Sequence, residues 1–495
     1  MNLKIINPKN LKREISLYGY EFSEKKYSLA MLTTAVASVL LGKLMYLDLK
    51  YILVIAVFSL LAAPFCIYNF YKVMFEQKRF SDATKYMETV TYSFMKHKLI
   101  LPALQDTEKI FEDGMMHDAL KKAIEHIEKG QYKNNLYKEA FEYIEKDFNN
   151  ERIKSINDFM LSVQSKGGDV KNIGELYLID KTEWEYNVGV LQQTKKDILN
   201  SIYIGCVAVV LFCFSFLYLE TYLPSEMNIA KAPITQITST GMILLLLIVV
   251  MFASKKMTTN WLEFDLVIDD KTALKEYEYV KNFDEKKEKR ESYIWAAPCF
   301  IICIVMLCLR HFILCAGFFI GGCFMLNQHM LNYKIAKKNL VKYVNVAFSK
   351  WVTEITLLIQ TDIVQVAIQD SYNTAAPVLK PELERVMQAI KNDPSNLKSY
   401  TCFFDFLDLE DIRTTMQVLY AMSETGAADA KIQLTNLQRV SMKLKNAAEK
   451  IKNDEIVTDM ELIKNAPIVI CCVVQFIDLA IFMWMGLAPI SSLAL

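Results

Sequence analysis

Apolar runs of membrane-spanning length alternate with densely charged stretches along this chain. A helix needs roughly 20 apolar residues to cross a bilayer, and backbone groups in lipid must be hydrogen-bonded within the spanning structure. The runs that approach or reach this length lie at 27–47, 51–70, 201–219, 237–253, 293–309, 312–325 and 466–488. The pattern therefore predicts seven transmembrane helices, with the first and second, and the fifth and sixth, joined as tight hairpins.

The two long charged stretches, 71–200 and 327–465, have a different periodicity. Their apolar residues recur three and four positions apart and β-branched runs are few, which is typical of amphipathic helices. Each stretch therefore predicts a helical bundle, whose charged residues we interpret as solvated faces more often than as binding sites. In the first stretch, breaks between helices are expected near His97–Pro102, Asp113-Gly114, Gly130-Gln131, Asn149-Asn150 and Gly167-Gly168.

The two charged stretches also resemble each other in sequence. Without a gap, the segment Lys85–Asp106 aligns with Ser349–Asp370, so that Ala103-Leu104-Gln105-Asp106 falls on Ala367-Ile368-Gln369-Asp370. With small gaps the shared order continues as far as Gly167 and Gly426. A repeat of this length predicts a domain duplication. The two glycines are expected at corresponding helix ends, where a left-handed conformation favours glycine.

Lysine and arginine residues flank the spans mainly on one side. Because short cytoplasmic loops are enriched in these residues, that side is expected to face the cytoplasm. Its flanking cations are Lys72, Lys78, Arg79, Lys195, Lys196, Lys255, Lys256, Lys334, Lys337 and Lys338, whereas the opposite loops carry Lys50, Lys231 and Arg310. Both helical domains are therefore predicted to be cytoplasmic, the C-terminus to point outward, and the protein to lie in the cell membrane.

The expected fold class is all-α: a polytopic membrane protein with about seven transmembrane helices and two repeated cytoplasmic helical-bundle domains. Composition agrees, because 53% of the 495 residues are hydrophobic while 23% are charged, a combination that is rare in soluble proteins. The expected segments are an N-terminal cytoplasmic segment 1–26, a transmembrane hairpin 27–70, a first helical domain 71–200, a transmembrane pair 201–254, a charged cytoplasmic linker 255–292, a second hairpin 293–326, a second helical domain 327–465 and a last transmembrane helix 466–490.

The chain lacks the motifs of common catalytic and nucleotide-binding sites. No GxxxxGK[ST] or GxSxG sequence occurs, and no GxGxxG follows a predicted strand. The five histidines are not spaced as helix-borne metal ligands, and the eleven cysteines contain no paired CxxC arrangement. A net charge of zero gives no support for nucleic acid as a partner. We therefore expect no enzymatic activity, no cofactor and no metal.

Asp478 is an ionisable residue in the middle of the last predicted span, close to Gln475. An ionisable side chain inside the bilayer is costly, so it is expected to face protein rather than lipid and is by default a functional candidate. The structural alternatives are that Asp478 pairs with Lys43 or fills a polar gap between packed helices.

A helical cytoplasmic domain that recurs between membrane spans resembles the type II secretion F family. This family comprises the inner-membrane platform proteins of type IV pili, type II secretion systems, tight-adherence (Flp) pili and the archaellum. Its domain has a glycine turn, an Ala-Leu helix start and a second helix that ends in glycine. The matching residues are Ala103-Leu104, Ala367-Ile368, Gly167 and Gly426, while Lys98 and Asp362 stand near the place of the first glycine.

The resemblance implies a membrane platform that couples a cytoplasmic secretion or pilus ATPase to the polymerisation of pilin subunits. Its partners would be that ATPase, the pilins and the lipid bilayer, without nucleic acid, and a homo-oligomer is left open. The candidate residues for partner coupling or for structure are Asp106, Asp370, Gly167, Gly426 and Asp478. The alternatives are a polytopic transporter, which would place its specificity in the spans, and a membrane sensor with helical cytoplasmic domains.

Overall fold

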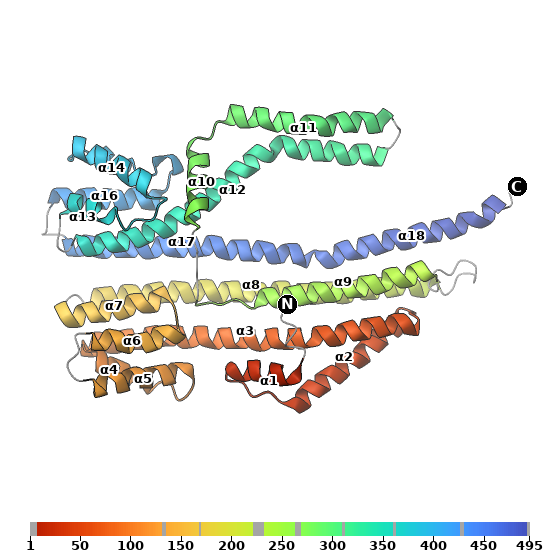
Figure 1. Ribbon diagram of the computed structural model, residues 1–495, viewed down its shortest axis with the longest axis horizontal. Coiled ribbons are helices and arrows are strands. Elements are labelled where there is room, and N and C mark those ends of the chain that lie inside the picture. Colours follow the sequence, from red (N-terminus) through yellow and green to blue (C-terminus); the bar gives the residue numbers. More distant parts are fainter. Residues whose placement is uncertain are drawn as a thin grey trace. The chain divides into compact units, whose positions relative to one another are not determined.

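Every element that the structure describes is a helix (Figure 1). The computed structural model describes residues 7–130, 135–167, 170–220, 232–262, 269–308, 312–359, 363–425 and 430–492. The chain divides into two compact units, of which unit 1 holds Met1–Phe264 and Asn453–Leu495, and unit 2 holds Asp265–Lys452. The all-α fold class is therefore confirmed for the described residues.

Unit 1 contains a membrane part and a helical bundle. Its helices are α1 (Pro8–Leu17), α2 (Glu24–Leu44), α3 (Leu49–His97), α4 (Ile100–Glu108), α5 (Met115–Lys129), α6 (Leu136–Asp147), α7 (Glu151–Lys166), α8 (Val170–Glu220), α9 (Pro233–Met257) and α18 (Ala466–Ser492). Breaks between helices fall at the expected places from His97 onward, because Lys98, Gly114 and Gly167 have positive φ angles that interrupt a right-handed helix. The end of α17 (Ala430–Lys464) also belongs to unit 1, from Asn453.

Unit 2 has its own helical bundle and a long hairpin. Its elements are α10 (Asp270–Lys281), α11 (Glu285–Cys308), α12 (Phe312–Leu358), α13 (Val364–Ser371), α14 (Lys380–Asn392), α15 (Leu397–Thr401), the 3₁₀ turn η4 (Asp405–Leu407), α16 (Glu410–Thr425) and α17 as far as Lys452. The helices α11 and α12 lie side by side as an antiparallel hairpin (Figure 1).

In the described part of the chain, five helices are long and apolar enough to cross a membrane, which fits a multi-pass membrane protein. They are Glu24–Leu44, Leu49–His97, Val170–Tyr218, Pro233–Met257 and the helical stretch Asn436–Met483. These overlap the predicted spans in 27–70, 201–254 and 466–490. The predicted hairpin 293–326 coincides with α11 and the start of α12, but the side chains around its turn lie outside the described residues, and its two spans stay predictions.

The spans and the first helical bundle share continuous helices. The helix α3 has 49 residues and α8 has 51, which makes each roughly 73–77 Å long at 1.5 Å per residue. Neither helix ends at the predicted domain borders, 70/71 and 200/201, because amphipathic periodicity begins there without a helix-breaking residue. Membrane and soluble parts of unit 1 are therefore joined by unbroken helix.

The bundle of unit 1 has one apolar core. Large side chains from α3, α7 and α8 meet in it, with Phe80 edge-on to Trp184 at 4.7 Å and Phe94 edge-on to Phe159 at 5.9 Å between ring centroids. The short helix α4 contributes Ala103 and Leu104, both fully buried. Burial of each large apolar side chain contributes about 1.5–3 kcal/mol, so this core holds the soluble ends of α3 and α8 together.

The bundle of unit 2 has a separate core built on aromatic rings. Trp351 of α12 stacks on Phe348 and Phe403, with ring centroids 5.3 and 5.9 Å apart. Its indole N–H donates to the Ser371 hydroxyl of α13 over 2.8 Å, which satisfies the polar edge of a buried ring. This pair holds α13 against the long helix α12.

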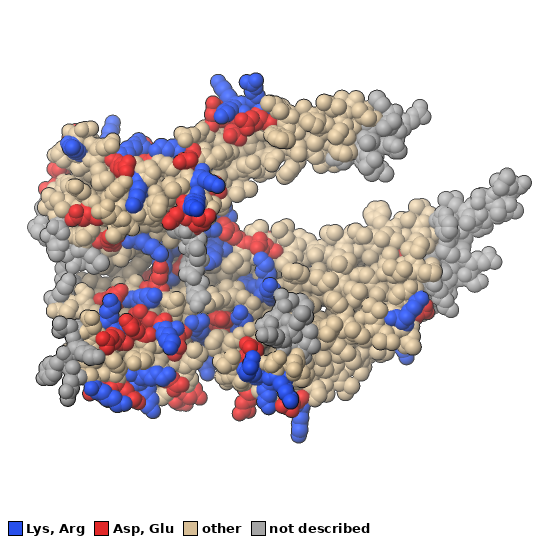
Figure 2. Space-filling view, viewed as in Figure 1, with Lys and Arg blue, Asp and Glu red and all other residues tan. Residues whose placement is uncertain are grey.

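In the membrane part of unit 1, α18 contacts α8 and α9, and α3 contacts the same two helices. Ile55, Val209, Ile243 and Val474 are buried where these four helices meet. The outward faces carry exposed apolar side chains such as Leu53, Ile204, Ile237 and Phe476, an arrangement suited to lipid rather than water. Figure 2 shows charged residues of unit 1 over α4 to α7 and around α1, and a mostly uncharged surface along α9 and α18.

The α2–α3 hairpin is closed by a residue of another helix. Gln236 of α9 accepts a hydrogen bond from the Asp48 backbone N–H over 2.9 Å and donates one to the Tyr46 carbonyl over 3.0 Å. Gly42 and Ile52 meet at the same place, where a Cβ on Gly42 would lie 2.6 Å from Ile52 Cγ1. The hairpin therefore depends on a glycine for its close approach and on α9 for its turn.

Candidate functional sites

The two aligned aspartates have different surroundings. Asp106 of α4 accepts hydrogen bonds from Lys109 over 3.2 Å and from Ser93 over 3.0 Å, and its carboxylate lies 2.9 Å from His97 Nε2. These partners, Lys109 first, lower the pKa of Asp106 to about 2. Asp370 is exposed and has no hydrogen bond or ion pair with any residue that the structure describes. Asp106 therefore fixes α4 to the end of α3, whereas no such contact of Asp370 occurs among the described residues.

Gly167 ends α7 as predicted, with a φ of 74° that favours glycine. Gly426 lies outside the described residues, directly after the last residue of α16. Lys98 ends α3 with a φ of 57°, in the left-handed region, and its N–H donates to the Phe94 carbonyl over 2.7 Å. The family resemblance places a glycine near this position. Here Lys98 itself adopts the left-handed conformation that a glycine would favour. Asp362, its counterpart, is outside the described residues.

Asp478 faces protein, as predicted. Its side chain is 2% exposed, and its carboxyl group lies next to the Thr238 hydroxyl of α9. The Asp478 Oδ1 atom is buried without a hydrogen-bond partner among the described residues, and so is the Thr235 hydroxyl. The proposed pairing with Lys43 is wrong, because Lys43 is exposed and forms no ion pair with a described residue. The structure instead supports a polar gap between α9 and α18.

A buried ion pair in unit 1 and a buried carboxylate in unit 2 are exceptions to the interpretation of bundle charges as mostly solvated faces. In unit 1, Arg152 of α7 donates to Asp180 of α8 over 2.8 Å, with exposed side-chain fractions of 2% and 5%. The guanidinium also lies 4.9 Å from the Trp184 ring centroid, a favourable cation–π geometry. No local pattern separates these two charges from the neighbouring exposed ones, so periodicity could not find them.

In unit 2, the carboxylate of Glu382 in α14 is completely buried. Its Oε1 accepts hydrogen bonds from Tyr277 over 2.6 Å and from Lys281 over 2.7 Å, both in α10. Its Oε2 accepts one from Arg385 over 3.3 Å. Burial, and then the bond to Glu382, raise the pKa of Tyr277, which keeps its hydroxyl group as a donor. This cluster binds α10 to the second bundle.

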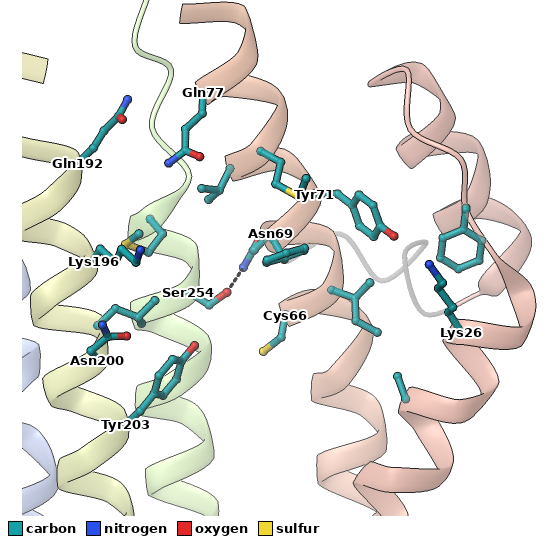
Figure 3. Close-up of a pocket in the computed structure, with 18 of the residues that line it drawn as sticks. Lys26, Cys66, Asn69, Tyr71, Gln77, Gln192, Lys196, Asn200, Tyr203 and Ser254 are labelled. Carbon is teal, nitrogen blue, oxygen red and sulfur yellow. Dashed lines mark hydrogen bonds between the residues drawn. The ribbon is translucent and has the colours of Figure 1, made fainter. Parts of the chain in front are cut away.

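A cavity of about 870 Å³ opens in unit 1 where α2, α3, α8 and α9 meet (Figure 3). Asn69 of α3 donates to the Ser254 hydroxyl of α9 over 3.1 Å across it. Figure 3 places Lys26 of α2 and Lys196 of α8 on opposite sides of this hydrogen bond. No sequence pattern predicts this cavity, because its walls come from four separate parts of the chain.

Among the described residues, no group of three or more histidine, cysteine, aspartate or glutamate side chains is placed to hold a metal ion. Comparison of the chain with protein-family models, with curated proteins and with solved structures finds no match. The resemblance to the type II secretion F family therefore rests on the sequence pattern.

Proposed function

We propose that this protein is a membrane platform for the assembly of a type IV-like or tight-adherence pilus, or of a type II secretion pseudopilus. In this role it couples a separate cytoplasmic ATPase to pilin polymerisation and is not itself an enzyme. The observation that carries the proposal is the continuity of α3 and α8 from apolar span to bundle core. A rigid helix shared by both parts can transmit a movement of the soluble bundle to the bilayer.

The proposed duplication is supported by the order of helices in the two stretches. In each, a long helix is followed by a short one, α4 or α13, and the bundle ends with a helix of 16 residues, α7 or α16. The aligned residues Ala103 and Ala367 are both fully buried in the short helices. Ile153 and Ile412, aligned near the starts of α7 and α16, are also buried.

We further propose seven spans with both bundles in the cytoplasm. In unit 1 the lysine-rich ends of three spans lie around one cavity. Its lining includes Lys26, Lys196 and Ser254, and Ser254 directly precedes Lys255. Single cysteines at Lys154 and Ser225, in a chain without its native thiols, test this topology with an impermeant thiol reagent on intact cells. We expect labelling at Ser225→Cys only; labelling at Lys154→Cys alone would reverse the topology.

The soluble bundles are proposed as the binding surface for the ATPase. Their charges are mixed, which favours a protein partner over nucleic acid, for which a basic face is expected. The purified protein is expected to hydrolyse no ATP and to co-purify with a secretion-type ATPase. Deletion of its gene should abolish surface pili while pilins remain in the membrane. Normal piliation in the deletion strain would refute the proposal.

One observation favours a second candidate, a polytopic transporter. The buried carboxylate of Asp478, with Thr238 beside it, is the kind of intramembrane polar group on which transport sites are built. A transporter would take up a solute into vesicles that contain only this protein, whereas a platform would not. Neighbouring genes for a secretion ATPase, a prepilin peptidase and small pilins would support the platform instead.

A further inference from the structure

The cavity in unit 1 lies where four apolar spans meet the charged part of the chain. Lys26 directly precedes the first span, and Phe70 is the last residue of the second. Tyr203 stands at the start of the third span and Ser254 directly after the fourth. All four residues line one cavity. The cavity therefore lies at the level where the lipid core of the bilayer meets water.

Aromatic residues at this level agree with that placement. Tyr27, Phe70, Tyr71 and Tyr203 line the cavity, and tyrosine is enriched where membrane helices meet the headgroup region. Below them, Ala30 and Ile67 give the cavity an apolar wall within the first two spans. The cavity therefore has a polar end and an apolar end, arranged along the direction in which a lipid lies.

The charge of the cavity is positive. Lys26 and Lys196 are among its lining residues, and no aspartate or glutamate is. Neither lysine has an ion pair with a residue that the structure describes, although neighbouring charges do, such as Lys12 with Glu24 and Lys256 with Asp459. Two cations without a protein counterion leave a place for an anion supplied from outside the chain.

A buried donor points to the same place. Gln192 of α8 lines the cavity, and its Nε2 atom is buried without a hydrogen-bond partner in the described part of the chain. A buried polar group without a partner is unfavourable because its desolvation is not compensated, and a bound acceptor would offset that cost. Phosphate oxygens are strong acceptors for both amide and ammonium donors.

We propose that this cavity binds an anionic phospholipid. The phosphate group lies at Lys196 and Gln192, which are four residues apart on one face of α8. Lys26 adds positive charge from the other side of the Asn69–Ser254 hydrogen bond (Figure 3), and the acyl chains follow the apolar wall at Ala30 and Ile67. The volume of about 870 Å³ fits a ligand much larger than a free ion. Basic pockets between membrane helices on the cytoplasmic side are known to suit anionic headgroups. A bound lipid would bridge α2, α3, α8 and α9 at the base of the helices that enter the first bundle.

The test uses the full-length protein in detergent, with lipid binding followed by native mass spectrometry. The probes are phosphatidylglycerol, zwitterionic phosphatidylcholine and inorganic phosphate. We expect one tightly bound phosphatidylglycerol, at least tenfold weaker binding of phosphatidylcholine, and no displacement by phosphate at equal concentration. Displacement by free phosphate would show an anion site without lipid specificity and would overturn the proposal.

The variant Lys26→Gln/Lys196→Gln is expected to lose at least tenfold in affinity for phosphatidylglycerol. Its matched control is Lys25→Gln/Lys255→Gln, which removes the same charge from exposed lysines next to the cavity that do not line it. If both double variants lost the same affinity for phosphatidylglycerol, the lipid would be held by general electrostatic attraction, and a defined site would be refuted.

A second variant keeps both lysines and fills the space between the helices. Gly189 lines the cavity, and a Cβ built on it meets no atom within 4 Å, so Gly189→Leu can be accommodated by α8. We expect at least tenfold weaker binding of phosphatidylglycerol to Gly189→Leu, with the melting temperature of the lipid-free protein retained. Unchanged binding to a folded Gly189→Leu protein would place the lipid elsewhere.

Discussion

Lys281 of α10 reaches the fully buried carboxylate of Glu382 in α14, with 2.7 Å between Lys281 Nζ and Glu382 Oε1. Removal of one partner of a buried ion pair typically costs about 3–5 kcal/mol, because the other charge is left uncompensated. Here Lys281 is partly exposed and can be solvated when the carboxylate is lost, so the lower part of that range is expected.

We predict that Glu382→Ala destabilises the protein by about 3 kcal/mol, measured as a fall in the melting temperature of the full chain in detergent. Asp408→Asn is the control, since the Asp408 side chain is 83% exposed in its pair with Arg413, and exposed pairs contribute less than about 1 kcal/mol. Similar effects of the two substitutions would contradict a structural role for the buried cluster.

Gly42→Ala should destabilise the α2–α3 hairpin. A Cβ at Gly42 would lie 2.6 Å from Ile52 Cγ1, so α2 and α3 must move apart, at a cost of about 1–3 kcal/mol for overpacking. Gly241→Ala is the matched control, because a Cβ on Gly241 in α9 meets no atom within 4 Å. It should be neutral or stabilising, as alanine is the better helix former. Melting temperatures measured in one detergent separate the two cases.

The Asp106 site predicts a pH dependence with a definite sign. The pKa of Asp106 is about 2 in the folded chain and about 3.9 in an unfolded chain. The ionised carboxylate therefore stabilises the fold above pH 4, and this contribution is lost as the pH falls from about 4 to 2.

We expect Asp106→Asn to melt below the unsubstituted protein at pH 7 and the difference to shrink below pH 4. The same substitution at the aligned position, Asp370→Asn, should change the melting temperature little at any pH, because Asp370 is exposed and has no partner among the described residues. A difference for Asp106→Asn that does not depend on pH would exclude ionisation as its cause.

Asp478→Asn should preserve insertion and folding, since an amide can keep the contact with Thr238 without a charge. Asp478→Leu should also insert, but it removes the polar neighbour of the Thr238 hydroxyl on α18. If Asp478 couples the platform to its partners, both variants reach normal membrane levels but produce fewer filaments. Wild-type filament output from both would make the carboxylate a packing feature only.

A break in α3 tests whether the continuous helix has a function. Lys78 is exposed, between the apolar span and the bundle core, and proline there costs about 3 kcal/mol and kinks the helix. Lys78→Pro should leave both cores assembled while abolishing filament assembly, whereas Lys78→Ala, which keeps the helix, should assemble filaments normally. Protease resistance of the bundle is the folding control. Normal assembly by a folded Lys78→Pro protein would argue against mechanical coupling.

The amino-acid sequence by itself determined the helices. Whether a segment suits lipid or water depends on its own residues, so an apolar run such as 237–253 predicts a membrane span. In the same way, Gly114 and Gly167 interrupt their helices through their own positive φ angles, whichever helices they pack against. The aligned residues Ala103 and Ala367 are both buried in short helices, α4 and α13. These features depend on neighbours within a few residues along the chain.

Only the tertiary structure decided which helices meet. It placed α18 against α8 and α9 in unit 1, although the repeat suggests that the last span belongs with the second half. It buried Arg152, Asp180 and Glu382, whose spacing is that of ordinary exposed charges, and it brought Lys26 and Lys196 to one cavity. The physical reason is that periodicity specifies an apolar face but not its partner. Burial of a charge depends on counterions from other helices, which no local pattern records.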